Sequence, residues 1–192
     1  DANSTNTQNT AIGYAALGAN TGAANVALGY NAAVNQTTAN YTVAIGDRSC
    51  GSGVLTGDHN VFVGHYTGYS NTSGTRNTSL GSNALAYNTS ADDNTAIGYA
   101  ALITNTVGYQ NTAVGKGALQ SNESGVNCTA IGKHALYHSL GNDNTAVGEY
   151  SGGALTTGTD NVFIGKNCGG ITTGTFNVLI GAEYTPSNQS NL

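Results

Sequence analysis

The chain has 192 residues with a formal net charge of -5, and Gly, Asn and Thr together make up about two-fifths of it. Only 8% of the residues are charged, against roughly 25% in an average soluble domain. No cluster of Lys or Arg is available to neutralise a phosphate backbone, so nucleic acid is a poor candidate partner. No stretch approaches the roughly 20 apolar residues that span a bilayer, so no membrane insertion by this segment is expected.

A short apolar motif that ends in Gly recurs along the chain. After a lead-in of residues 1–8, it returns every 16, 17 or 18 residues across 9–184, and a polar tail follows at 185–192. A fixed period of this kind indicates a solenoid in which each turn stacks on the next. The repeat glycines are Gly13, Gly29, Gly46, Gly64, Gly81, Gly98, Gly115, Gly132, Gly148, Gly165 and Gly181.

The three residues before each repeat glycine have the character of a β-strand. The first is always Thr or Val and the third is always Ile, Leu or Val, so we expect both columns to point into the core of the coil. The middle residue is mostly Ala and faces the other way. Because a strand that is apolar on both faces needs a cover on each side, this middle column is predicted to face the axis of a homo-oligomer. The predicted axis-facing residues are Ala11, Ala27, Ala44, Phe62, Ala96, Ala113, Ala130, Ala146, Phe163 and Leu179.

A second pattern follows the glycine in ten of the eleven turns, with a small residue at the third position and often Leu at the fourth, as at Ala101 and Leu102. Since this period is too short for a helix and a strand, each turn is predicted to hold two short strands joined by tight bends. The expected fold is all-β, a parallel β-roll or β-solenoid of about eleven turns and roughly 50 Å in length. Asn stands four residues before the glycine in nine turns, and we interpret this column as structural.

The motif Asn-Thr-Ala-Ile-Gly, as at Asn94 to Gly98, resembles the head repeat of YadA-like trimeric autotransporter adhesins. The longer form Asn-Thr-Ala-Ile-Gly-Tyr-Ala-Ala-Leu, present at 9–17 and 94–102, is similar to repeats of phage and virus fibres and of surface fibres of predatory bacteria. The resemblance implies a left-handed roll and a homotrimer. It also implies an extracellular position on a cell-surface or virion fibre that attaches to a host or prey surface.

The additional residues of each turn are predicted to form loops along one edge, at Gly51 to His59, Tyr69 to Arg76, Ala86 to Asp93 and Tyr137 to Asp143. Aromatic side chains in and beside these loops are the candidate binding residues for a host or prey glycan or protein. A Tyr ring offers a flat apolar face and a hydroxyl group, which suits both kinds of partner. The candidates are Tyr69, Tyr87, Tyr109, Tyr137 and His138.

The residue directly after each repeat glycine varies freely and is expected to point outward. In three consecutive turns it is Lys133, Glu149 and Lys166, which predicts an exposed ladder of ion pairs.

No catalytic or metal-binding signature accompanies the repeat. A nucleophile elbow, a zinc-type histidine pair and a cysteine cluster are all missing, so we expect no enzyme activity, no metal and no cofactor. Cys50, Cys128 and Cys168 lie in turns too far apart for a disulfide, which predicts three buried free thiols.

Three alternatives to an attachment fibre remain open. The chain can be a passive spacer whose binding tip lies elsewhere. It can be a polysaccharide-cleaving tailspike that uses loop carboxylates such as Asp58, Asp92, Asp93 and Asp143. It can also be an ice-binding solenoid, which is disfavoured because the regular Thr/Val column is assigned to the core.

Overall fold

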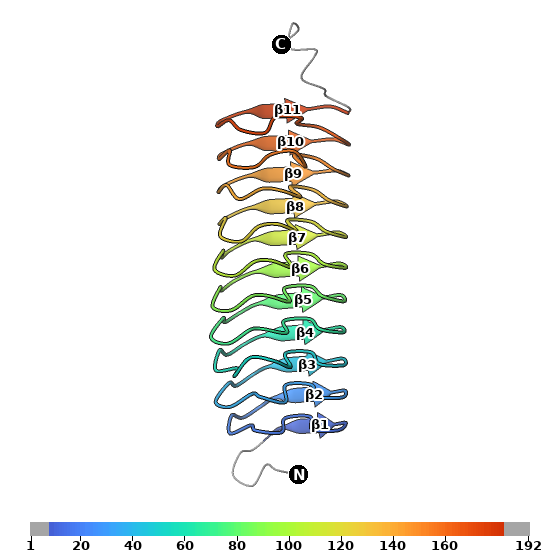
Figure 1. Cartoon of the computed structure of the whole chain (residues 1–192), viewed down its shortest axis with the longest axis vertical. Helices are drawn as coiled ribbons and strands as arrows, with labels where there is room; N and C mark the ends of the chain where they lie inside the picture. The colour runs from blue at the N-terminus through green and yellow to red at the C-terminus, as the bar shows by residue number, and fades with distance from the viewer. Residues whose placement is uncertain (1–7, 183–192) are drawn as a thin grey trace, which may run out of the picture.

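The computed structural model describes residues 8–182 and shows a straight stack of similar turns (Figure 1). Residues 1–7 of the predicted lead-in and the predicted tail at 185–192 lie outside the described part. Each turn contributes one three-residue strand: β1 (Thr10–Ile12), β2 (Val26–Leu28), β3 (Val43–Ile45), β4 (Val61–Val63), β5 (Thr78–Leu80), β6 (Thr95–Ile97), β7 (Thr112–Val114), β8 (Thr129–Ile131), β9 (Thr145–Val147), β10 (Val162–Ile164) and β11 (Val178–Ile180).

The strands form a single parallel sheet in sequence order, from β1 to β11. Each strand pairs with the next in the same register, so that Thr95 lies beside Thr112 and Ile97 beside Val114. The prediction of an all-β parallel β-solenoid with a period of about 17 residues is therefore confirmed. Within the described residues, no helix is long and apolar enough to cross a membrane.

The repeat glycines are required by backbone conformation and by close stacking. Their φ angles lie between 128° and 148°, a region that residues with a Cβ rarely adopt. A Cβ on Gly98 would also lie 2.7 Å from the carbonyl oxygen of Gly115 in the next turn. Any other residue in this column would both strain the backbone and separate the turns.

The segment after each glycine is hydrogen-bonded to its neighbours but is not a strand in the described residues, so the predicted second strand is wrong. Positive φ angles at alternate residues, such as 55° at Ala100 and 49° at Leu102, prevent the extended conformation. The Ala100 N–H donates to the Ser82 carbonyl in the turn before, and the Leu102 N–H donates to the Ala118 carbonyl in the turn after, each at 3.0 Å. This segment, which forms the wall of the coil opposite the strands, is thus hydrogen-bonded to the turns on both sides of it.

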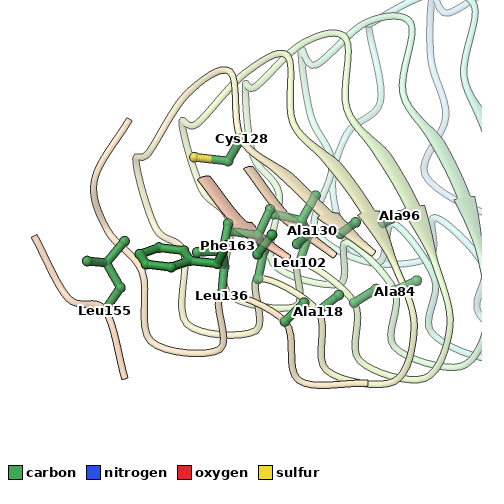
Figure 2. Packing of buried hydrophobic residues seen from close by; sticks show 14 of the residues in the cluster. Ala84, Ala96, Leu102, Ala118, Cys128, Ala130, Leu136, Leu155 and Phe163 are labelled. Atoms are coloured by element: carbon green, nitrogen blue, oxygen red, sulfur yellow. The ribbon is translucent and has the colours of Figure 1, made fainter. Parts of the chain in front are cut away.

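The orientation of the strands is the reverse of the prediction. The middle column faces the interior of the coil, where Ala96, Ala130 and Phe163 share one core with residues such as Leu102 and Leu136 (Figure 2). All predicted axis-facing residues are fully buried within this one chain except Ala11 and Leu179, in the end turns. Because the coil is narrow, Ala on the strand fits opposite Leu from the other wall, and two inward columns of Ile and Val would not fit.

The Asn column before the strands is confirmed as structural. The Asn94 side chain is fully buried; its Oδ1 accepts from the Asn111 N–H at 3.0 Å, and its Nδ2 donates to the Gly108 carbonyl at 2.9 Å. Most turns repeat this pattern. Each Asn therefore bonds to the turn that follows it and satisfies buried backbone groups on both sides of a bend.

A second buried column of amides, seven residues after the repeat glycine, corrects the prediction that the additional residues of each turn form loops along one edge. Asn71, Asn88 and Asn105 are fully buried, and the Nδ2 groups of Asn88 and Asn105 donate to the Oδ1 of the preceding member at 2.7 and 3.2 Å. The residues that follow remain in the wall, since the Thr72 N–H donates to the Thr89 carbonyl of the next turn at 2.9 Å. The predicted loops are thus stacked corners of the coil.

All three cysteines are free and buried, as predicted. Cys50 replaces a core Leu, and burial raises the pKa of its thiol to about 12. Cys128 stands in the Asn column, where its Sγ donates to the Gly141 carbonyl at 3.2 Å.

Candidate binding surfaces

The outer face of the parallel sheet presents exposed apolar side chains along the described stack. Its two columns are the first and third residues of every strand, and none of them is charged. Leu80 is 49% exposed and Ile131 is 42% exposed, although both lie well inside the stack. Together the columns present on the order of 1,000 Å² of side-chain surface, more than the few hundred Å² of a typical monomer's largest apolar patch.

A second surface is built from rings that the sequence pattern does not group. Tyr137 and His138 lie five and six residues after their repeat glycine, and His134 and Tyr150 each lie two residues after theirs. His134 contacts Tyr137 and Tyr150 with ring centroids 4.9 and 4.7 Å apart, and Tyr137 contacts His138 at 4.5 Å. The chain reaches this arrangement because the two residues between His134 and Tyr137 turn into the core.

These four side chains border a hollow of about 480 Å³ whose remaining lining is Gly153 and Ala154. The hollow follows from a change of residue size between two turns. Gly153 and Ala154 occupy the positions in turn nine that Tyr137 and His138 occupy in turn eight. The rings of turn eight therefore project beyond the smaller residues of turn nine. The volume of the hollow lies within the usual range for small-ligand sites, roughly 300–1,000 Å³.

Positive charge lies beside this hollow. The Lys133 Nζ is 5.4 Å from the centroid of Tyr150 and 3.2 Å from the Glu149 carboxylate, which also binds Lys166 at 3.6 Å. The predicted ion-pair ladder is thus confirmed, and hydrogen bonding with Lys133 lowers the pKa of Glu149. Burial, together with the charges of Lys133 and Lys116, lowers the pKa of His134 and favours its neutral form.

A related cluster lies nearer the N-terminus, around Arg48. Its guanidinium lies 5.5 Å from the ring centroids of both Tyr30 and Tyr66, and its Nη1 donates to the Tyr66 hydroxyl at 2.8 Å. Tyr66 also contacts Tyr69, with centroids 4.7 Å apart. The cation of this cluster is therefore already bound within the chain.

The structure divides the predicted binding residues between these surfaces. Tyr137 and His138 belong to the hollow and Tyr69 to the Arg48 cluster, whereas Tyr87 and Tyr109 are about half exposed and outside both clusters. His134 and Tyr150 were not among the binding residues predicted from the sequence. The signal was their shared position two residues after a repeat glycine, which places them next to each other in adjacent turns.

The loop carboxylates that could serve a tailspike each accept hydrogen bonds from the preceding turn. Asp58 accepts from the Asn40 N–H and Asp92 from the Thr75 N–H, each at 2.7 Å, and Asp143 accepts from the Asn127 side chain at 3.0 Å. Arg76 binds Asp93 through two nitrogen atoms. In the described part of the chain, no group of three or more His, Cys, Asp or Glu residues is placed to hold a metal ion.

Comparison of the chain with protein-family models, with curated proteins and with solved structures finds no match. Function is therefore inferred from the geometry of these surfaces.

Proposed function

We propose that this chain is a segment of a trimeric extracellular fibre that attaches to a host or prey cell surface without catalysis, in the manner of YadA-like adhesin heads. The observation that carries the proposal is the outer sheet face, with its two uncharged columns of β-branched and aliphatic side chains along the whole stack. Its exposed area is comparable to one partner's share of a standard protein interface, about 800 Å². A face of this kind needs a partner that is equally long, equally apolar and equally regular.

A second copy of the same chain meets all three requirements. Because the parallel strands stack in constant register, the face repeats with the same spacing in every turn. Two copies that pack side by side in the same direction therefore match each other turn by turn. The absence of charge from the two columns avoids the cost of burying unpaired charges. The number three comes from the resemblance to the adhesin heads and fibres.

The aromatic clusters come from the segment after the repeat glycine, not from the strands, so assembly through the sheet face leaves them accessible. Three copies of a weak site on one rigid rod raise the strength of attachment through avidity. A passive spacer shares the same assembly but lacks this binding. Retention of labelled fibre on intact host or prey cells distinguishes the two roles.

The assembly is tested by placing charge on the sheet face. The double variant Leu80→Asp and Ile131→Asp is expected to reduce the mass in solution to that of a single chain, because each carboxylate would be buried without a partner. Val107→Asp is the matched control, since Val107 is 53% exposed and lies outside the strands. An unchanged mass of the double variant would contradict assembly through this face.

An ice-binding solenoid is the second candidate, and one observation favours it. The Thr/Val column points outward, so the reason for disfavouring this function from the sequence was wrong. Thr95, Thr112 and Thr129 lie in register on neighbouring strands, about 4.8 Å apart, beside an aliphatic column. This function requires the face to be free. Thermal hysteresis in micromolar protein, lost in the Leu80→Asp and Ile131→Asp variant, would establish it in place of the fibre.

A further inference from the structure

We propose that the hollow bordered by His134, Tyr137, His138 and Tyr150 binds an acidic sugar, a pyranose that carries a carboxylate. This inference rests on the proposed attachment function and names its ligand class. It depends on three features of the site, namely the arrangement of the rings, the hydrogen-bonding groups and the local charge.

The rings form walls at steep angles to each other above a small floor. The plane of His134 makes angles of 54° with Tyr137 and 85° with Tyr150, and the planes of Tyr137 and His138 are at 89°. Gly153 and Ala154 form the floor, where no large side chain occupies the space. A pyranose has an apolar face of C–H groups that packs against an aromatic ring, and its edges carry hydroxyl groups. The hollow of about 480 Å³ accommodates such a ring.

Polar groups at the site are oriented for hydroxyl groups. The Gln120 side-chain nitrogen donates to the Tyr137 hydroxyl at 2.8 Å, which leaves the phenolic hydrogen free to donate to a ligand. Burial lowers the pKa of His134 and favours its neutral form, which offers one donor and one acceptor nitrogen. These groups favour a polyhydroxylated ligand over a purely apolar one.

The charge beside the hollow selects an acid. All three lysines of the chain, Lys116, Lys133 and Lys166, stand directly after repeat glycines in turns seven, eight and ten, and Glu149 is the one acidic residue among them in that column. This column therefore carries an excess of positive charge on a chain whose net charge is -5. The Lys133 ammonium group lies 5.4 Å from the centroid of Tyr150, which lines the hollow. It shares the Glu149 carboxylate with Lys166 and so retains donors for a ligand carboxylate.

The Arg48 cluster provides an internal comparison. It also combines Tyr rings with a cation, but Arg48 is occupied by the Tyr66 hydroxyl and lies 3.9 Å from the Asp47 carboxylate. Asp47 balances this cation one to one, whereas beside the hollow the single Glu149 carboxylate is shared by Lys133 and Lys166, which leaves an excess of positive charge there. We therefore assign acidic-sugar binding to the hollow alone.

The test measures binding of sialyllactose and of a glucuronic-acid disaccharide by saturation-transfer NMR and calorimetry, with lactose as the neutral probe. We expect the wild-type protein to bind at least one acidic sugar about tenfold more tightly than lactose, a difference of about 1.4 kcal/mol. Tyr150→Ala is expected to abolish binding of both classes. Lys133→Gln is expected to remove the preference for the acid and keep the weak binding of the neutral sugar. Tyr87→Ala, an exposed Tyr outside the hollow, is the control and should bind as the wild type does.

Two results would overturn the inference: no binding of either acidic sugar, or binding that Tyr150→Ala leaves unchanged at an unaltered melting temperature. Equal binding of the acidic sugars and lactose would overturn the ligand class. The mass in solution is measured on the same samples. A trimer that binds no acidic sugar refutes this site and leaves the fibre in place, whereas a monomer that binds one refutes the fibre and leaves the site.

Discussion

Gly68 faces the ring of Phe62 across the interior of the coil, so closely that a Cβ atom at position 68 would overlap with the ring. The corresponding positions of four other turns hold Ala on the strand and Leu opposite, as at Ala96 and Leu102. In this turn the large residue therefore lies on the strand and the small residue on the opposite wall, the reverse of the Ala and Leu pair. The total side-chain volume in the core stays similar.

This exchange predicts a strong coupling between the two positions. Gly68→Leu alone should destabilise the fold by about 1–3 kcal/mol through overpacking, and Phe62→Ala alone by about 3–5 kcal/mol through a cavity. The double variant recreates the common pair and should regain most of the loss, because Leu85 shows that this backbone conformation accepts Leu, at a φ of 50°. Thermal unfolding followed by circular dichroism measures the three changes, and simple additivity would contradict the account.

The Asn column predicts a large cost for removing one amide. Asn94→Leu should destabilise the chain by about 1–3 kcal/mol, because it leaves the Asn111 N–H buried without a partner and leaves the Gly108 carbonyl with only the Asn105 side chain as donor. Asn35→Ala is the control, since the Asn35 side chain is exposed and its hydrogen bonds are 3.3 and 3.4 Å long. Equal melting temperatures for the two variants would show that the column is not structural.

The buried thiols predict low chemical reactivity in the native state. The thiolate is the reactive form, and because the pKa of Cys50 is raised to about 12, its ionised fraction at pH 8 is on the order of one in ten thousand. An aromatic disulfide reagent should therefore detect no thiol at pH 8 until the chain unfolds, and then three. Thr157→Cys, at an exposed position, should react at once and validates the assay. Rapid reaction of the native wild-type chain would contradict the burial.

His134 predicts a dependence of stability on pH. Its pKa is lowered below 6.5, first by burial and then by Lys133 and Lys116, so the unfolded chain binds its proton more readily than the folded chain does. Its contribution is fully present above pH 6.5 and is lost as the pH falls toward the folded pKa. In an NMR titration, Lys133→Gln should raise the His134 midpoint, whereas Lys166→Gln should leave it unchanged. A wild-type midpoint at or above 6.5 would contradict this prediction.

The repeat made the architecture predictable, but not the direction in which the strands face. The glycine spacing determines eleven stacked turns, and the β-branched columns determine where the strands lie. To predict which strand residues face inward, the width of the coil must be known, because Ala96 and Ile97 are both apolar and either could be the inward residue. The narrow interior, filled by Leu102 from the opposite wall, decides in favour of Ala96.

The candidate site was predicted only in part for a similar reason. Tyr137 and His138 were identified because they lie in one segment, whereas His134 and Tyr150 join them only across adjacent turns and through alternate positive φ angles. Alternation between left-handed and right-handed residues leaves no periodic hydrophobic signal. A sequence pattern alone therefore could not reveal that positions two and five after the glycine come into contact.

The central claim, that the outer sheet face is covered by further copies of this chain, is tested most directly by the absolute mass in solution. Light scattering on a sizing column near neutral pH should give three times the 19.3 kDa of a single chain. A stable monomer of 19.3 kDa would contradict the fibre and leave the face of Thr and aliphatic columns free, as an ice-binding surface requires.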